Sequence, residues 1–232
     1  LAHFDQSVHP MLPVWSHYAN ENWCMTGYHS VSVIADAIIK DVFNEDIERA
    51  LGACSKTASY PLYDGLNYYM KYNYVPDDKN SYSVSKTLEY AYDDWCISQI
   101  AKKSGNDSLD KVFSKRAANY QRVFNTENGF MQPKLANGNF RRNFDPLVTH
   151  GQGFIEGNAY NYGLYVPHEP EKLIQMMGGK NKFEGFLDTL FSGHLDDKHI
   201  EKNEDITREG IMGLYVHGNE PGHHIPYLYN FT

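Results

Sequence analysis

Apolar residues recur at a spacing of 3.6 residues wherever this sequence has a clear period, and this pattern constrains the fold most. Asn106 is a suitable N-cap for the clearest helix, and Gly105 ends the helix before it. Its apolar stripe consists of Leu109, Val112, Phe113, Ala117, Tyr120, Val123 and Phe124. Convincing strands with a period of two residues are absent, so the sequence predicts an all-α class.

Similar patterns predict further helices at about 30–41, 45–57, 83–104, 173–177 and 182–191. Long loops rich in Gly, Pro, Asn and Tyr separate them, at 60–81, 125–153 and 194–209. No linker or composition shift interrupts the chain, which we read as a single domain. Helix pairs joined by such aromatic loops are typical of a helical bundle or an α/α toroid, and periodicity does not separate the two.

Charge and hydropathy exclude two classes of partner. The formal net charge of −8 disfavours nucleic acid, which needs a basic surface. No apolar run approaches the roughly 20 residues of a membrane helix. The chain begins at Leu1 without a signal-like segment, so we expect the natural N-terminus to precede it. Cys24, Cys54 and Cys96 form no CxxC pair, and we interpret them as small buried apolar residues.

Glu156 is the strongest candidate for acid–base chemistry. It lies between Phe154 and Tyr160 and beside Gly157, so burial against aromatic rings is expected. Desolvation raises the pKa of a carboxyl group and makes it usable as a general acid near neutral pH. A second interpretation places Glu156 at a helix N-terminus, where it only complements the helix dipole.

The densest polar cluster is the segment at 217–224, which reads HGNEPGHH. A helical zinc motif needs both His on one continuous helix face, and Pro221-Gly222 interrupts any such helix. Asn219 and Glu220 instead offer oxygen atoms that suit Ca²⁺ or sugar hydroxyls. We therefore favour an oxygen-based cation or sugar site over zinc, with a helix-to-loop junction carrying surface His as the alternative.

Glu89 and Asp93 share a face of the helix predicted at 83–104, with Asp94 beside them. Like charges on a partly apolar face need partners, and we expect Arg or Lys from a neighbouring helix to pair with them. A ligand at the mouth of a cleft is the alternative partner. Ser30 is expected to cap the helix at 30–41, and Asp36 to be buried with a backbone or Arg partner. The chain has no GxSxG, P-loop or dinucleotide motif.

Six segments, in order, resemble glycoside hydrolase family 92, the calcium-dependent inverting exo-α-mannosidases, many of them from gut Bacteroidetes. The segments are GYHSVSVIADA (27–37), SKTLEYAYDDWCISQIA (85–101), GFIEGNAYNY (153–162), VPHE (166–169), MMGG (176–179) and GLYVHGNEPGHHIPYLYN (213–230). The resemblance runs almost from end to end. Gly163 departs from the pattern, since a bulkier residue is expected there.

The resemblance implies an N-terminal β-sandwich followed by an (α/α)6 barrel, with residues 1–232 as one fragment of the barrel domain. It implies that Glu156 is the general acid and that the general base is an Asp beyond Thr232. Asn219 and Glu220 are the expected Ca²⁺ ligands. The expected substrate-binding residues are His29, Asp94, Trp95, Asn158, Asn219, Glu220 and His223.

The implied activity is removal of terminal α-linked mannose, in α-1,2 or α-1,3 linkage, from oligosaccharides or glycoprotein glycans. The protein is then expected to be secreted, periplasmic or on the cell surface, and the fragment alone to be inactive. Two alternatives stay open: another (α/α)6 glycosidase acting on a different glycan, and a non-catalytic glycan-binding or structural module.

Overall fold

The computed structural model describes residues 1–149, 151–200 and 208–232. The chain divides into two compact units, unit 1 (Leu1–Val75 and Lys86–Arg122) and unit 2 (Pro76–Ser85 and Val123–Thr232). Helix α5 (Ser83–Ser104) begins in unit 2 and continues in unit 1. No shift in composition marks this division, and the expected single domain stays a prediction.

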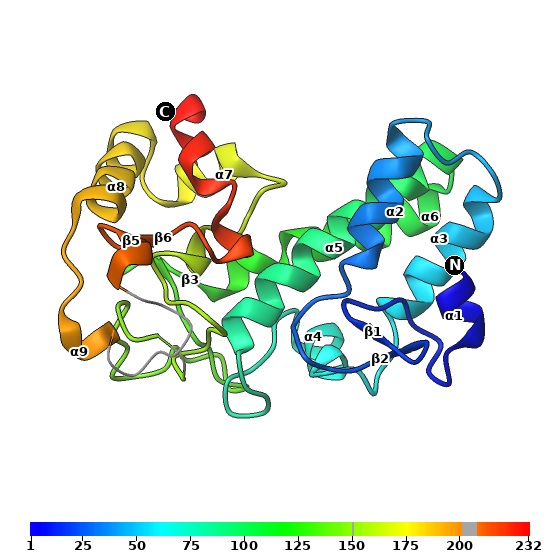
Figure 1. Cartoon of the computed structure of the whole chain (residues 1–232), viewed down its shortest axis with the longest axis horizontal. Coiled ribbons are helices and arrows are strands. Elements are labelled where there is room, and N and C mark those ends of the chain that lie inside the picture. The colour runs from blue at the N-terminus through cyan, green and yellow to red at the C-terminus, as the bar shows by residue number, and fades with distance from the viewer. Residues whose placement is uncertain (150, 201–207) are drawn as a thin grey trace. The chain divides into compact units, whose positions relative to one another are not determined.

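Unit 1 is built from helices and one short hairpin (Figure 1). Besides α5, its elements are α1 (Ala2–Gln6), β1 (Ser16–His17), β2 (Asn20–Glu21), α2 (Ser30–Ile39), α3 (Ile47–Thr57), α4 (Leu66–Tyr72) and α6 (Asp107–Ala117), followed by the 3-10 helix η1 (Ala118–Val123). β1 and β2 pair antiparallel.

Side-chain caps begin two helices of unit 1, α3 and α6, and the apolar faces of α2 and α3 are buried. Asn106 accepts a hydrogen bond from the backbone N–H of Leu109 at 3.1 Å, which confirms it as the N-cap of α6. Asp46 caps α3 in the same way through Arg49. The apolar residues that α2 and α3 bury join α5 in one core; they are Val31, Ala35, Ile38, Ala50, Leu51, Ala53 and Cys54.

Unit 2 combines short helices, 3-10 turns and two hairpins. Its elements are β3 (Phe124–Asn125), β4 (Phe130–Met131), η2 (Tyr162–Leu164), α7 (Pro170–Met176), α8 (Lys180–Ser192), α9 (Asp197–Ile200), η3 (Arg208–Gly210), β5 (Ile211–Met212), β6 (Tyr215–Val216), η4 (Glu220–Gly222) and η5 (Ile225–Phe231). β3 pairs antiparallel with β4, and β5 with β6. α8 buries Phe183, Leu187 and Leu190, as its periodicity predicts.

These elements confirm the all-α class, with differences at particular residues. The apolar stripe at 109–124 is not one helix, because α6 ends at Ala117, the chain tightens into η1, and Phe124 begins β3. Helix α4 lies inside the stretch expected to be a loop. Cys54 and Cys96 are buried as predicted, but Cys24 is exposed.

Two predictions for α2 were wrong. Ser30 is the first helical residue rather than the cap, and its hydroxyl donates to the carbonyl of Pro13. Asp36 is exposed and pairs with Lys40 one turn later, because residue 36 lies on the outward face of α2.

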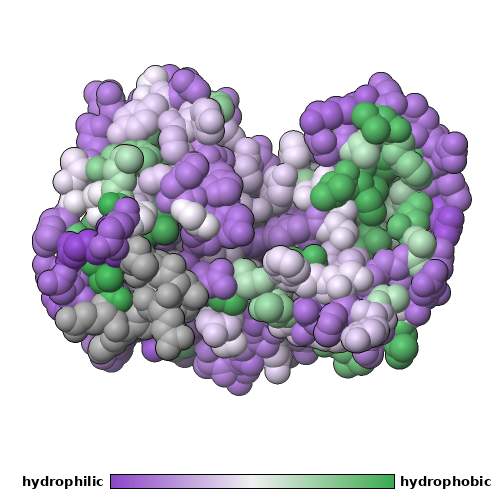
Figure 2. Space-filling model, in the orientation of Figure 1, coloured by the Kyte–Doolittle hydropathy of each residue, from purple (hydrophilic) through white to green (hydrophobic). Residues whose placement is uncertain are grey.

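Apolar side chains gather on the surface of unit 1 around α2 (Figure 2). Val33 is 70% exposed and Val42 is 79% exposed. Within the described ranges, no helix has the length and hydropathy needed to cross a membrane.

Candidate active site

The loop that carries Glu156 is fastened to the first turn of α5. We call residues 151–161 the Glu156 loop. The carbonyl of Gly153 accepts hydrogen bonds from the backbone N–H groups of Val84 (2.9 Å) and Ser85 (3.1 Å). The Ser85 hydroxyl in turn accepts from the N–H of Ile155 at 3.1 Å. The first N–H groups of a helix have no partner within it, so the Glu156 loop and α5 satisfy each other.

Gly153 makes this close approach possible. Its φ is +86°, a backbone conformation that favours glycine. A Cβ at this position would lie 2.6 Å from Pro133 and 2.9 Å from Val84.

Glu156 sits in a turn and not at a helix start. Its φ is +51°, which is uncommon for a residue with a side chain, and the next helical element, η2, begins only at Tyr162. The interpretation of Glu156 as a helix-dipole partner is therefore wrong. Its flanking residue Phe154 is buried, while Glu156 and Tyr160 are half-buried. Strained backbone of this kind clusters at functional sites, which agrees with a role for Glu156 in chemistry.

The turn that follows β6 contacts the backbone of Glu156. The side-chain amide of Asn219 donates a hydrogen bond to the carbonyl of Glu156 at 2.5 Å. A Cβ on Gly157 would lie 3.5 Å from that amide nitrogen, which is an ordinary contact. A small pocket lies here, lined by Thr149, Glu156, Gly157, Asn158, Asn161, Leu195, Leu214, Val216 and Asn219. The structure thus brings together the two sequence segments that carried the predicted acid and the predicted cation ligands.

Glu220 and His223 follow Asn219 and are both exposed. They belong to the turn around η4, a short 3-10 helix that begins at Glu220 and has Pro221 in its first turn. The ring centroids of His217 and His223 are 4.9 Å apart. The Nδ1 atom of His217 shares a hydrogen bond with the Tyr215 hydroxyl at 2.7 Å. Burial lowers the pKa of the neighbouring His224, which bonds to the carbonyl of Leu164.

Asn158 and Asn161 lie inside the Glu156 loop and are buried, with 3% and 6% of their surface exposed. Asn158 Oδ1 accepts from the backbone N–H groups of Tyr160 (3.0 Å) and Asn161 (3.2 Å), and its Nδ2 donates to the carbonyl of Leu147. This geometry gives Asn158 a structural task, and its contact with substrate stays a prediction. The sequence did not single out Asn161, because its side chain pairs with backbone atoms of Leu214 and Val216, more than 50 residues away.

The other predicted site residues belong to unit 1. The ring of His29 bonds to two carboxylates of α5: its Nδ1 is 2.9 Å from Asp93, and its Nε2 contacts Glu89. Burial alone would lower the pKa of His29, but the charges of Asp93 and Glu89 outweigh it and raise that pKa well above its ordinary value. The expected partner of this acidic pair was Arg or Lys, and the structure provides an imidazole instead.

Asp94 forms a second buried network. It accepts hydrogen bonds from Arg116 Nε (2.8 Å) and from the hydroxyls of Tyr28 (2.9 Å) and Tyr69 (3.1 Å). Burial raises the pKa of Asp94 to about 6, although Arg116 lowers it. Arg116, on helix α6, is thus the cationic partner of Asp94, for which no partner was predicted. Trp95 is half-buried and stacks on Tyr92. Substrate contacts of His29, Asp94 and Trp95 stay predictions.

The side-chain oxygen atoms of Asn219 and Glu220 are of the kind that a hard cation binds. Asn219 Oδ1 accepts no hydrogen bond within the described part of the chain, and the Glu220 carboxylate faces solvent. Ca²⁺ takes six to eight oxygen ligands, so these two side chains fit as part of a shell that sugar, water or other residues complete. Across residues 1–149, 151–200 and 208–232, no group of three or more His, Cys, Asp and Glu side chains is arranged to hold a metal ion.

Similar proteins fall into one class. The structure of the family GH92 α-mannosidase BT3965 from Bacteroides thetaiotaomicron shares 46% sequence identity, with a TM-score of 0.90 over 99% of this chain and 30% of that one. The family GH92 inverting mannosidase BT2199 from the same organism shares 33% identity, with a TM-score of 0.82 over 99% of this chain and 32% of that one. An uncharacterized secreted glycosidase of Arthroderma benhamiae is 27% identical over 91% of this chain and 30% of its own length.

These relatives, with the helical fold and a carboxylate turn beside a small pocket, define the class as the glycoside hydrolases. The model of the glycosyl hydrolase family 92 catalytic domain matches residues 1–232, and the chain belongs to this family. It spans about 30% of the length of the relatives named here. The resemblance drawn from six sequence segments is thereby confirmed.

Proposed function

We propose that the full-length protein removes terminal α-linked mannose from glycans with inversion of configuration, and that Glu156 is its general acid. The observation that carries this proposal is the turn at Glu156, with its positive φ, its half-buried side chain and the Asn219 amide closing over it. Two family members named as mannosidases support mannose as the sugar, one of them recorded in complex with mannoimidazole.

The proposed reaction divides between an acid and a base. Glu156 donates its proton to the glycosidic oxygen as the bond from that oxygen to the anomeric carbon breaks. A water molecule attacks the anomeric carbon from the opposite face and loses its proton to an Asp that we expect from a segment after Thr232. Inverting enzymes separate the two carboxyl groups by roughly 6.5–9.5 Å to leave room for this water.

Asn219 and Glu220 are the proposed Ca²⁺ ligands of the terminal mannose site. A bound Ca²⁺ supplies a charge that holds sugar hydroxyls and favours ring distortion toward the transition state. The chain's own task there is to present two side-chain oxygens beside the acid. We expect α-1,2 or α-1,3 linkages to be preferred, and the protein to be exported to the periplasm or cell surface, in keeping with the secreted relative.

The test replaces Glu156 by Gln in the full-length protein and follows mannose release from α-1,2-mannobiose. Loss of a general acid is expected to lower kcat by about 10²- to 10⁴-fold on this poor leaving group. Glu171→Gln, an exposed glutamate on α7, is the matched control and should change nothing. Near-normal turnover by Glu156→Gln would remove the assignment. Release of a sugar other than mannose, or glycan binding without hydrolysis, would favour one of the two alternatives.

A further inference from the structure

We propose that Asn161 is a positioning residue for the general acid. Its buried side-chain amide takes the place of a backbone peptide group and fixes the hairpin that leads to Asn219 against the turn that carries Glu156. The inference rests on the proposed function and adds a residue whose side-chain hydrogen bonds go to the backbone of Leu214 and Val216 and to Asn158.

The amide of Asn161 pairs with the β5–β6 hairpin as a neighbouring strand would. Its Nδ2 donates to the carbonyl of Leu214 at 2.7 Å, and its Oδ1 accepts from the N–H of Val216 at 3.1 Å. In an antiparallel strand, the carbonyl of one residue and the N–H of the residue two positions later point to the same side. One planar amide with a donor and an acceptor therefore satisfies both.

Asn158 fixes the orientation of this amide. Its Oδ1 accepts from Asn161 Nδ2 at 3.3 Å and from the Asn161 backbone N–H at 3.2 Å. Both hydrogens of the Asn161 amide are thereby engaged, one to Leu214 and one to Asn158. Asn161 is 6% exposed, so a side chain that leaves any of these backbone groups unpaired incurs a desolvation cost.

The hairpin held by Asn161 leads directly to the acid. Asn219 lies three residues after Val216 and donates to the carbonyl of Glu156. A shift of the hairpin therefore moves Asn219 and the backbone of Glu156 together. Misplacement of a reacting group by about 1 Å can cost about 100-fold in rate.

The experiment compares two substrates with the full-length wild-type protein, Asn161→Leu and Asn161→Asp. Leu keeps the approximate volume and removes both hydrogen-bonding functions, while Asp keeps the shape and replaces the donor toward Leu214 by an acceptor. We expect both variants to lower kcat on α-1,2-mannobiose by about 100-fold. On a dinitrophenyl α-mannoside, whose leaving group needs little protonation, kcat should change far less.

Asn161→Gln, which keeps both amide functions, should recover part of the kcat lost on α-1,2-mannobiose. In the profile of kcat/KM against pH, the alkaline limb should move only in the Leu and Asp variants. Asn125→Leu is the matched control, because Asn125 is a buried asparagine of unit 2 that bonds to Gln132. Asn125→Leu should change kcat by the same factor on both substrates. Thermal unfolding of each variant identifies any that fail to fold. If Asn161→Leu does not fold, the comparison of Asn161→Asp with Asn161→Gln tests the inference.

Equal losses on the two substrates would overturn the inference, since they would indicate general destabilisation rather than misplacement of the acid. Unchanged kinetics for Asn161→Leu would overturn it too. The proposed function fails separately, if wild type releases no mannose or if Glu156→Gln retains normal turnover on mannobiose.

Discussion

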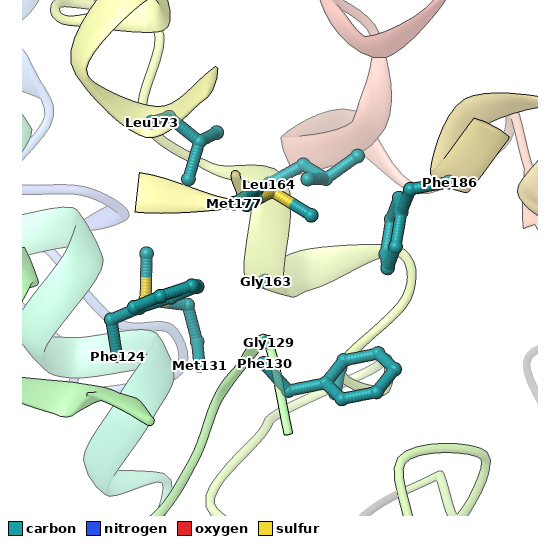
Figure 3. Close-up of a pocket in the computed structure, with 10 residues that line it drawn as sticks. Phe124, Gly129, Phe130, Met131, Gly163, Leu164, Leu173, Met177 and Phe186 are labelled. Carbon is teal, nitrogen blue, oxygen red and sulfur yellow. The ribbon is translucent and has the colours of Figure 1, made fainter. Parts of the chain in front are cut away.

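Gly163 lies where the packing of unit 2 leaves room for a methyl group. It lies among the residues that line a small apolar pocket, next to Met131 and Leu164 (Figure 3). Its φ is not positive, and an added Cβ would lie 3.6 Å from Met131, an ordinary contact. The glycine that departs from the family pattern is therefore not required by the backbone.

Gly163→Ala should raise the stability of the full-length protein, because alanine restricts the unfolded chain and fits the native conformation. We expect a gain of about 0.4–1 kcal/mol, seen as a higher Tm. Gly213→Ala is the control with the opposite sign, since Gly213 has a φ of +65° and its Cβ would lie 2.5 Å from the backbone of Phe191. A lower Tm for Gly163→Ala would show that the pocket has no room for the methyl group.

His29 carries a pH dependence whose sign follows from its neighbours. Its pKa is raised by Asp93 and Glu89, so its contribution to stability is complete below the ordinary pKa of about 6.5 and is lost as the pH rises through the folded value. His29→Gln should lower the unfolding free energy by about 3–5 kcal/mol near neutral pH, because two buried carboxylates lose their cation.

The difference in Tm between wild type and His29→Gln should shrink as the pH is raised from neutral toward alkaline values. Thermal unfolding at a series of pH values measures this. His194→Gln, in an exposed pair with Asp196, should leave Tm unchanged and serves as the control. A difference in Tm that stays constant over the alkaline range would mean that His29 is neutral in the folded protein.

At the scale of elements, the hairpin of β1 and β2 depends on one buried carboxylate. Glu21 is 2% exposed, and its two oxygens accept hydrogen bonds from four backbone N–H groups, those of Val14, Trp15, Asn22 and Trp23. No pattern in the sequence indicated this, because the four donors lie on both sides of Glu21 and meet it only after the chain reverses.

Glu21→Gln should loosen this loop, since one carboxylate oxygen becomes an NH₂ group that faces N–H donors. A cost of about 1–3 kcal/mol is expected for the unpaired donors. Hydrogen exchange should show faster exchange confined to residues 14–23. Glu45→Gln changes an exposed glutamate and should leave exchange as it was. Unchanged protection of residues 14–23 in Glu21→Gln would contradict this role.

Helices were predictable wherever an apolar stripe or a local cap determines them, as with Asn106 at α6 and the buried face of α8. The end of α6 was not, because the stripe continues through a 3-10 turn that keeps a similar apolar spacing. At the site, Glu156 and Asn219 stood out by residue type. Asn161 and the His29–Asp93 pairing did not, since their partners are backbone atoms or side chains that are more than 50 residues away in sequence.

At the scale of the whole molecule, calcium should stabilise the full-length protein. A ligand that binds only the folded state adds about 2.7 kcal/mol at a hundred times its Kd. We expect Ca²⁺ to raise Tm and a chelator to abolish mannose release reversibly. Asn219→Ala should reduce the Tm shift, whereas Asn181→Ala, on an exposed position of α8, should not. Equal shifts in both variants would remove Asn219 from the metal shell.

The amide of Asn161 also limits how this chain can evolve. Of the common side chains, only Asn and Gln place a donor and an acceptor side by side on one neutral planar group. Because the atoms it meets belong to the backbone, no substitution at Leu214 or Val216 can compensate for a different residue at 161. Glutamine is therefore the one replacement at position 161 that keeps both hydrogen-bonding functions toward the hairpin.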